Sequence, residues 1–172
     1  MSKIIVISKN IRVNRVVAAN VVRNFIYGNI LALVSLVILS NDDNPTIKSG
    51  VVGISLGMLA VFAAHFYADS LSKRLVLQRS LSSKQIGDII KESSFILVPV
   101  IFPEFFLLLT LLHYWDIYMS ILLGMISCML MLLSISIISA KLEKLSIIKS
   151  TALIAINLIV RLVVVGFEIV VH

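Results

Sequence analysis

The chain has 172 residues, of which 59% are hydrophobic and 14% are charged, and its mean hydropathy is +1.07. A soluble domain is about half apolar and about a quarter charged, so this composition excludes an ordinary soluble globular protein. The same balance excludes a disordered chain, and the single cysteine excludes a disulfide scaffold. Lipid is therefore the expected solvent, and the expected fold class is an all-α polytopic integral membrane bundle.

Apolar runs long enough to cross a bilayer recur five times along the sequence. A membrane-spanning helix needs about 20 mainly apolar residues. The connections between the runs are short or amphipathic, which predicts one membrane domain over residues 1–172. The five predicted helices cover about residues 24–40, 50–71, 94–113, 117–140 and 151–171.

Two further segments, 10–23 and 72–93, are predicted to be amphipathic and cytoplasmic. In the first, arginines recur at helical spacing, which is typical of a helix that lies on an anionic leaflet before the chain turns inward. In the second, Ser82 and Gln85 form a possible capping box ahead of an isoleucine stripe. We expect both segments to pack on the membrane surface, with a regulatory or partner-binding helix as the alternative.

The cations of the connecting segments are strongly asymmetric. Thirteen fall on one side of the predicted topology: Lys3, Lys9, Arg12, Arg15, Arg23, Lys73, Arg74, Arg79, Lys84, Lys91, Lys141, Lys144 and Lys149. The other side has Lys48 alone, together with Asp42, Asp43 and Asp116. The positive-inside rule then predicts a cytoplasmic N-terminus and an external C-terminus, in what we expect to be a bacterial inner membrane. Topology thus accounts for the net charge of +6, and no nucleic-acid partner is expected.

Two opposite charges are predicted close to the middle of the bilayer. Glu104 lies near the centre of the third run and Arg161 near the centre of the fifth. Ionisable groups inside a membrane are costly unless they are paired or hydrated. We therefore expect a Glu104–Arg161 ion pair, which either locks two helices together or belongs to a transport path.

Other polar residues extend this pattern. Asn157, Arg161 and Glu168 lie on one side of the fifth predicted helix and must face the bundle interior, a water-filled crevice or a partner. His65 and Asp69 are four residues apart and share one face of the second helix. They are expected to form either a proton relay or cation-binding pair, or a helix cap and an interhelical hydrogen bond.

Prolines and small residues predict local geometry. Pro99 and Pro103, the second immediately before Glu104, predict a kink in the third helix. Small residues that recur every four positions predict close helix packing, and they are Ser49, Gly53 and Gly57 in the second helix and Ser120, Gly124 and Cys128 in the fourth.

Arg23, Tyr27 and Gly28 at the entry to the first helix, the five-helix layout and the cytoplasmic amphipathic segment resemble the vacuolar iron transporter family. The resemblance implies a related five-helix fold that is dimeric through the first helix. Members of that family have an acidic residue shortly after this glycine, whereas residues 27–31 read Tyr-Gly-Asn-Ile-Leu. No metal ligand is therefore carried over.

These patterns favour proton-linked or cation-linked transport, with Glu104 as carrier, Arg161 as counter-charge, His65 and Asp69 as an inner relay and Glu168 as an outer acid. The alternative is a membrane immunity or accessory protein that does not transport and that binds a partner through its polar stripe. No catalytic or cofactor motif is present, so neither an enzyme nor a cofactor is expected. The expected partners are the bilayer and either a second copy or another membrane protein.

Overall fold

The structure, a computed structural model, describes residues 2–142 together with 151, 152, 155 and 159. This part of the chain is helical and contains no strand. Four of its segments are long and apolar enough to cross a membrane, namely Val17–Ser40, Ile47–Leu77, Ser83–Leu112 and Ile117–Ser139. The described part of the chain is therefore all-helical, and its four long apolar segments are those of a membrane protein, as the composition predicts. Most of the fifth predicted helix, with Asn157, Arg161 and Glu168, lies outside the described residues.

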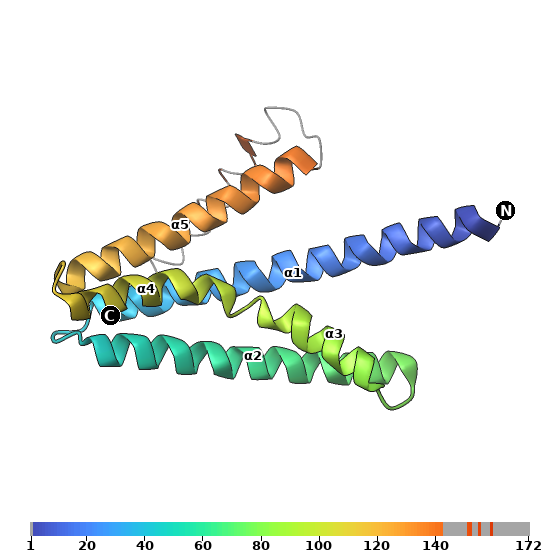
Figure 1. Cartoon of the computed structure of the whole chain (residues 1–172), viewed down its shortest axis with the longest axis horizontal. Helices are drawn as coiled ribbons and strands as arrows, with labels where there is room; N and C mark the ends of the chain where they lie inside the picture. The colour runs from blue at the N-terminus through green and yellow to red at the C-terminus, as the bar shows by residue number, and fades with distance from the viewer. Residues whose placement is uncertain (1, 143–150, 153–154, 156–158, 160–172) are drawn as a thin grey trace.

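Helix α1 runs without interruption over Ser2–Ser40. It joins the predicted surface segment 10–23 and the first predicted span into one helix, and no turn separates them (Figure 1). Neither glycine nor proline stands between the two parts, so no residue at their junction ends the helix.

Helix α2 covers Ile47–Leu77 and is longer at both ends than the predicted 50–71. Its start is fixed by a capping box in which Thr46 and Ser49 each bond the other's backbone. At the other end, Gln78 takes the left-handed conformation (φ 50°) and stops the helix. The amphipathic helix α3, Ser83–Ser94, follows after a short turn and begins with the predicted capping box of Ser82 and Gln85.

The predicted kink in the third span is confirmed as a complete break. After α3 the chain forms the 3-10 turn η1, Val98–Val100, then helix α4, Ile101–Leu109, and the 3-10 turn η2, Thr110–Leu112. Pro99 has no N–H and disfavours helical geometry at the residue before it, so α3 cannot continue into α4. Helix α5, Ile117–Leu142, returns along the bundle, and Asp116 accepts a hydrogen bond from the backbone of Met119 at its start.

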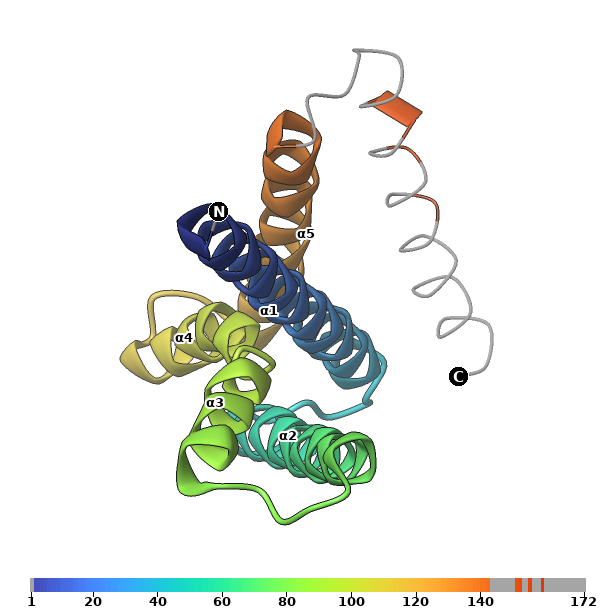
Figure 2. The ribbon, with the colours of Figure 1, turned by 90° about the vertical axis from the view of Figure 1, so that its right-hand side faces the viewer.

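The bundle is centred on α1. Seen from the N-terminal side, α5, α4 and the pair α2 and α3 lie around it (Figure 2). The core consists mainly of aliphatic side chains from four helices and the break, and its members include Leu33, Leu36, Ile54, Met58, Ile96, Leu107, Ile121 and Cys128. Gly124 packs closely, since a Cβ there would lie 3.1 Å from a methyl group of Leu36 and 3.4 Å from Pro103 Cα. The close packing predicted for the small residues of α5 is thus confirmed.

The small residues of α2 behave differently. Gly50 is buried against Leu39 and Leu107, but Gly53 and Gly57 are exposed, and a Cβ at either would meet nothing within 4 Å. No described residue packs against Gly53 or Gly57, so that face of α2 is open in the described part of the chain. The close packing predicted for these two glycines stays a prediction.

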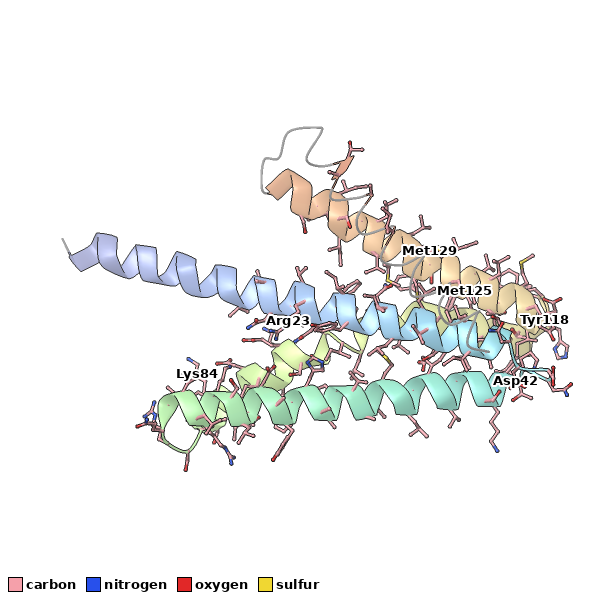
Figure 3. The ribbon with its side chains drawn as sticks, turned by 180° about the vertical axis from the view of Figure 1, so that it is seen from behind. Arg23, Asp42, Lys84, Tyr118, Met125 and Met129 are labelled. Carbon is pink, nitrogen blue, oxygen red and sulfur yellow. The ribbon has the colours of Figure 1, made fainter. Side chains whose placement is uncertain are left out.

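The two ends of the bundle differ in charge. Figure 3 shows Arg23 and Lys84 toward one end and Asp42 toward the other. The helix order places the described cations that follow α2 at the first end, which is called the basic end below, and Asp116 beside Asp42 at the opposite end, the acidic end. This grouping is the one on which the predicted orientation rests.

Candidate functional site

Glu104 lies in the first turn of α4 and is half-buried between helices. Its carboxylate oxygen Oε1 accepts a short hydrogen bond from the hydroxyl group of Ser55 on α2. Ser55 stands eight positions after the first residue of α2, about 12 Å along a helix that rises 1.5 Å per residue. The carboxylate is therefore well inside an apolar span, toward the acidic end of the bundle.

No cationic side chain contacts Glu104 in the part of the chain that the structure describes, and the predicted partner Arg161 lies outside that part. Burial of a carboxylate in this position costs free energy because the group loses water. The hydrogen bond from the Ser55 hydroxyl group offsets part of that cost. The break around Pro99 and the proline at position 103 place the group on a short helix of its own. This polar pair, Ser55 and Glu104, is the outer pair below.

Within the described residues no hydrogen bond joins His65 to Asp69, so the predicted proton relay or cation-binding pair stays a prediction. The His65 ring instead packs against the Tyr27 ring of α1, with a centroid separation of 5.5 Å and an interplanar angle of 47°. Both members of the predicted pair are half-buried on α2. The structure thus gives His65 a neighbour on another helix, as the packing alternative expects, but through its ring face.

A second polar cluster, which the sequence analysis missed, lies where α3 meets α1. Asn20 Nδ2 donates to Glu92 Oε2 at 2.9 Å, and Asn24 Nδ2 donates to the Glu92 carbonyl oxygen at 2.9 Å. Ser93 follows Glu92 at the end of α3 and is fully buried, as is Asn24. We call these four residues, Asn20, Asn24, Glu92 and Ser93, the inner junction.

Several buried polar atoms near this junction have no hydrogen-bond partner among the described residues. They include Asn24 Oδ1, Ser93 Oγ and both amide atoms of Asn29, on residues with 0% exposure. Buried polar groups are nearly always bonded, and in lipid an unbonded one costs several kcal/mol. Each of these atoms is therefore a place where the described chain does not complete its own hydrogen bonding.

Beside the inner junction, the backbone of α1 lies unusually close to the backbone of the break. A Cβ added to Gly28 would lie 2.8 Å from the carbonyl carbon of Ile96 and closer still to its oxygen, so only glycine fits. Pro99 cannot donate to the Ile96 carbonyl, and the Val100 N–H bonds to Leu97. The break thus brings the Ile96 carbonyl group against Gly28 of α1, one helical turn from Asn24.

The polar residues of α1 lie at successive depths. At 1.5 Å per residue, Asn20, Asn24 and Asn29 stand about 30, 24 and 16 Å from the end of α1 at Ser40. Ser55 and Glu104 come next, about 12 Å from the acidic end. The two clusters and Asn29 together form a series of polar levels across the apolar bundle.

A cavity of about 550 Å³ lies apart from these clusters. It opens between α1 and α2 at the acidic end and is lined by Ser35, Ile38, Leu39, Asn41, Asp42, Ser49, Gly50, Gly53 and Ile54. Gly53 and Ser55 are two positions apart, so they point to nearly opposite sides of α2. The cavity and Glu104 therefore lie on different sides of that helix.

The donor sets do not form a transition-metal centre. No group of three or more His, Cys, Asp or Glu side chains that could hold a metal ion occurs among residues 2–142 as described. Oxygen atoms of amides, hydroxyls and single carboxylates dominate both clusters, and such atoms favour protons and hard cations.

Two features of the sequence indicate the α1 side of the inner junction. Asn20 and Asn24 are one helical turn apart, and Asn24 and Asn29 interrupt an apolar run. The hydrogen-bond partner of Asn20 and Asn24 is Glu92, which is 72 and 68 positions away from them along the chain, and no local pattern indicates that pairing.

Comparison with protein families, with curated proteins and with solved structures finds no match to this chain. The resemblance to the vacuolar iron transporters accordingly stays a prediction.

Proposed function

We propose that this protein moves protons or a small cation across a membrane and that Glu104 is the carrier. The observation that supports this most directly is the Ser55–Glu104 hydrogen bond, because it leaves an acid in an apolar span without a cationic partner among the described residues. A carboxylate held by one hydroxyl donor can gain and lose a proton or exchange a cation.

The polar levels support a route to this carrier. Asn24 in the inner junction and Asn29, which lies between the junction and the outer pair, offer buried polar atoms that have no partner among the described residues. Broken helices supply free carbonyl groups to ions in transporters, and the break at Pro99 lies beside Asn24 on the neighbouring helix. In this proposal residues 151–171 form a fifth membrane helix, which brings Arg161 to the depth of Glu104 as its counter-charge.

The proposed orientation places the basic end in the cytoplasm and the acidic end outside a bacterial inner membrane. The inner junction is then the cytoplasmic entrance, and the outer pair lies nearer the external face. Glu168 and Asn157 belong to the same proposed fifth helix.

The test is flux in proteoliposomes that contain the purified protein. Proton movement is followed with an entrapped pH dye, and cation movement with radioactive tracers, under an imposed gradient. We expect Glu104→Gln to abolish flux, Ser55→Ala to reduce it and Glu104→Asp to retain part of it. Asp88→Asn removes an exposed acid from α3 and is the matched control, with native flux expected.

Absence of flux for every ion tested, or native flux in Glu104→Gln, would refute the transport proposal. The second candidate function would then take its place: a non-transporting partner protein. One observation favours that candidate, since the glycine face of α2 at Gly53 and Gly57 is open. Gly57→Leu would block helix docking there, so loss of a co-purifying membrane protein in that variant would support it.

A further inference from the structure

Two buried oxygen atoms of the inner junction are available as acceptors in the described part of the chain. Because Asn24 Nδ2 donates to the Glu92 carbonyl group, the amide orientation is fixed, and Oδ1 must accept from something else. This oxygen and Ser93 Oγ are buried and unbonded in the described part of the chain. Asn20 holds Glu92 Oε2, which leaves Oε1 as a second acceptor on that carboxylate.

The electrostatics of the junction favour a positive ligand. Glu92 and Ser93 are in the last turn of α3, where the helix dipole places partial negative charge. The Glu92 carboxylate adds a full negative charge, and no ion pair with a lysine or arginine is formed there within residues 17–139. The neighbouring Lys91 is exposed. An anion is therefore disfavoured at this position, and a cation is favoured.

The donor set also decides the class of cation. Divalent sites gather several carboxylates, and zinc sites gather His and Cys, whereas this junction has one carboxylate, one amide oxygen and one hydroxyl. Its single negative charge matches a single positive charge. The close approach of Gly28 to the Ile96 carbonyl group keeps α1 and the break at backbone distance, which favours a small ion.

We infer that the inner junction binds a sodium-sized monovalent cation between the Glu92 carboxylate, the Asn24 amide oxygen and the Ser93 hydroxyl. Asn20 is a positioning residue, because it holds the carboxylate through its other oxygen. Binding here does not require transport, so the inference goes beyond the proposed function. In a transporter, this would be the first binding site for a cation that enters from the basic end.

The experiment is equilibrium binding of radioactive ²²Na⁺ to the purified full chain in detergent, at constant ionic strength held with choline chloride. We expect saturable binding to the native protein that excess unlabelled Na⁺ removes. Glu92→Gln and Asn24→Leu should each weaken binding at least about tenfold, the loss expected from about 1.4 kcal/mol. Asp88→Asn, which removes the same charge from an exposed position of α3, should bind as the native chain does.

Ser93→Ala removes one oxygen with little change in volume, so it tests the site even if the other variants fail to fold. It should weaken binding severalfold while the protein remains monodisperse in gel filtration. Lack of saturable binding up to about 0.1 M Na⁺ would overturn the inference and would indicate that ordered water satisfies these atoms instead. Displacement of ²²Na⁺ by micromolar Ca²⁺ would overturn the assignment to a monovalent ion.

Because binding is measured without a gradient, its outcome is independent of flux. Bound Na⁺ in a protein that shows no flux would keep the site and remove the transport proposal. Flux through Glu104 without Na⁺ binding would do the reverse.

Discussion

Gly28 of α1 lies directly against the backbone carbonyl group of Ile96, at the point where the third membrane span is broken. This contact joins the central helix to the break, and the inner junction is formed on the turn beside it. Gly28 has no side chain and Pro99 has no N–H. Together these two residues thus set the geometry of the contact between α1 and the break.

Gly28→Ala is expected to destabilise the protein by about 1–3 kcal/mol, because the new Cβ would overlap backbone atoms that cannot rotate away. Thermal unfolding in detergent measures the effect. Gly57→Ala is the matched control, since its Cβ would meet nothing and alanine favours the helix by about 1 kcal/mol. Equal stability of the two variants would contradict the close Gly28 contact.

Removal of the Ser55 hydroxyl group is expected to lower the free energy of unfolding by more than the net contribution of the Ser55–Glu104 hydrogen bond. In Ser55→Ala the half-buried Glu104 carboxylate loses its donor, which should lower the free energy of unfolding by about 1–3 kcal/mol. Glu104→Leu in the same background should recover part of that loss, because the acceptor is then removed as well. A double-mutant cycle on unfolding measures the coupling, and additive effects would show that the two residues do not interact.

Asn29→Leu is expected to stabilise the protein while impairing flux. Both amide atoms of Asn29 are buried and have no partner among the described residues, so an apolar side chain of similar size should raise the free energy of unfolding by about 1–3 kcal/mol. The flux loss follows if Asn29 is one of the polar levels on the route. A decrease in stability would instead mean that a bound water or ion completes the hydrogen bonding of Asn29.

The packing of α5 on α1 is expected to depend on Gly124. Gly124→Leu should destabilise the protein by about 1–3 kcal/mol, because the Leu36 methyl groups already lie 3.1 Å and 3.4 Å from the position of a Cβ. Leu36→Ala should relieve part of this cost in the double variant. If the double variant is less stable than the sum of the single effects predicts, the two residues are not in contact in the way the structure shows.

The main architecture follows from the sequence because the bilayer imposes one simple requirement. Long apolar runs must be helices, and their number and approximate limits can be counted. The break at Pro99 and the capping box of Ser82 are equally local, since each depends on residues a few positions apart. These features were therefore within reach of sequence reasoning.

The candidate site was predicted less completely. Glu104 stands out as an acid in an apolar run, but its donor Ser55 is an ordinary residue 49 positions away. A serine in a membrane helix usually bonds its own backbone, as Ser35 does with Leu31, so its identity alone does not indicate an interhelical role. Likewise, His65 and Asp69 share a helix face, yet ring packing against Tyr27 determines where the imidazole lies.

The burial of Cys128 gives this protein a practical advantage for labelling chemistry. Its thiol is the only one in the sequence and is fully enclosed by the core, so aqueous maleimides have no access to it. Any cysteine introduced into a loop, for example at Asp42 or Lys84, would then be the sole reactive position in the native chain. Impermeant reagents applied to intact cells could thereby report which side of the membrane each loop faces, without first preparing a cysteine-free background.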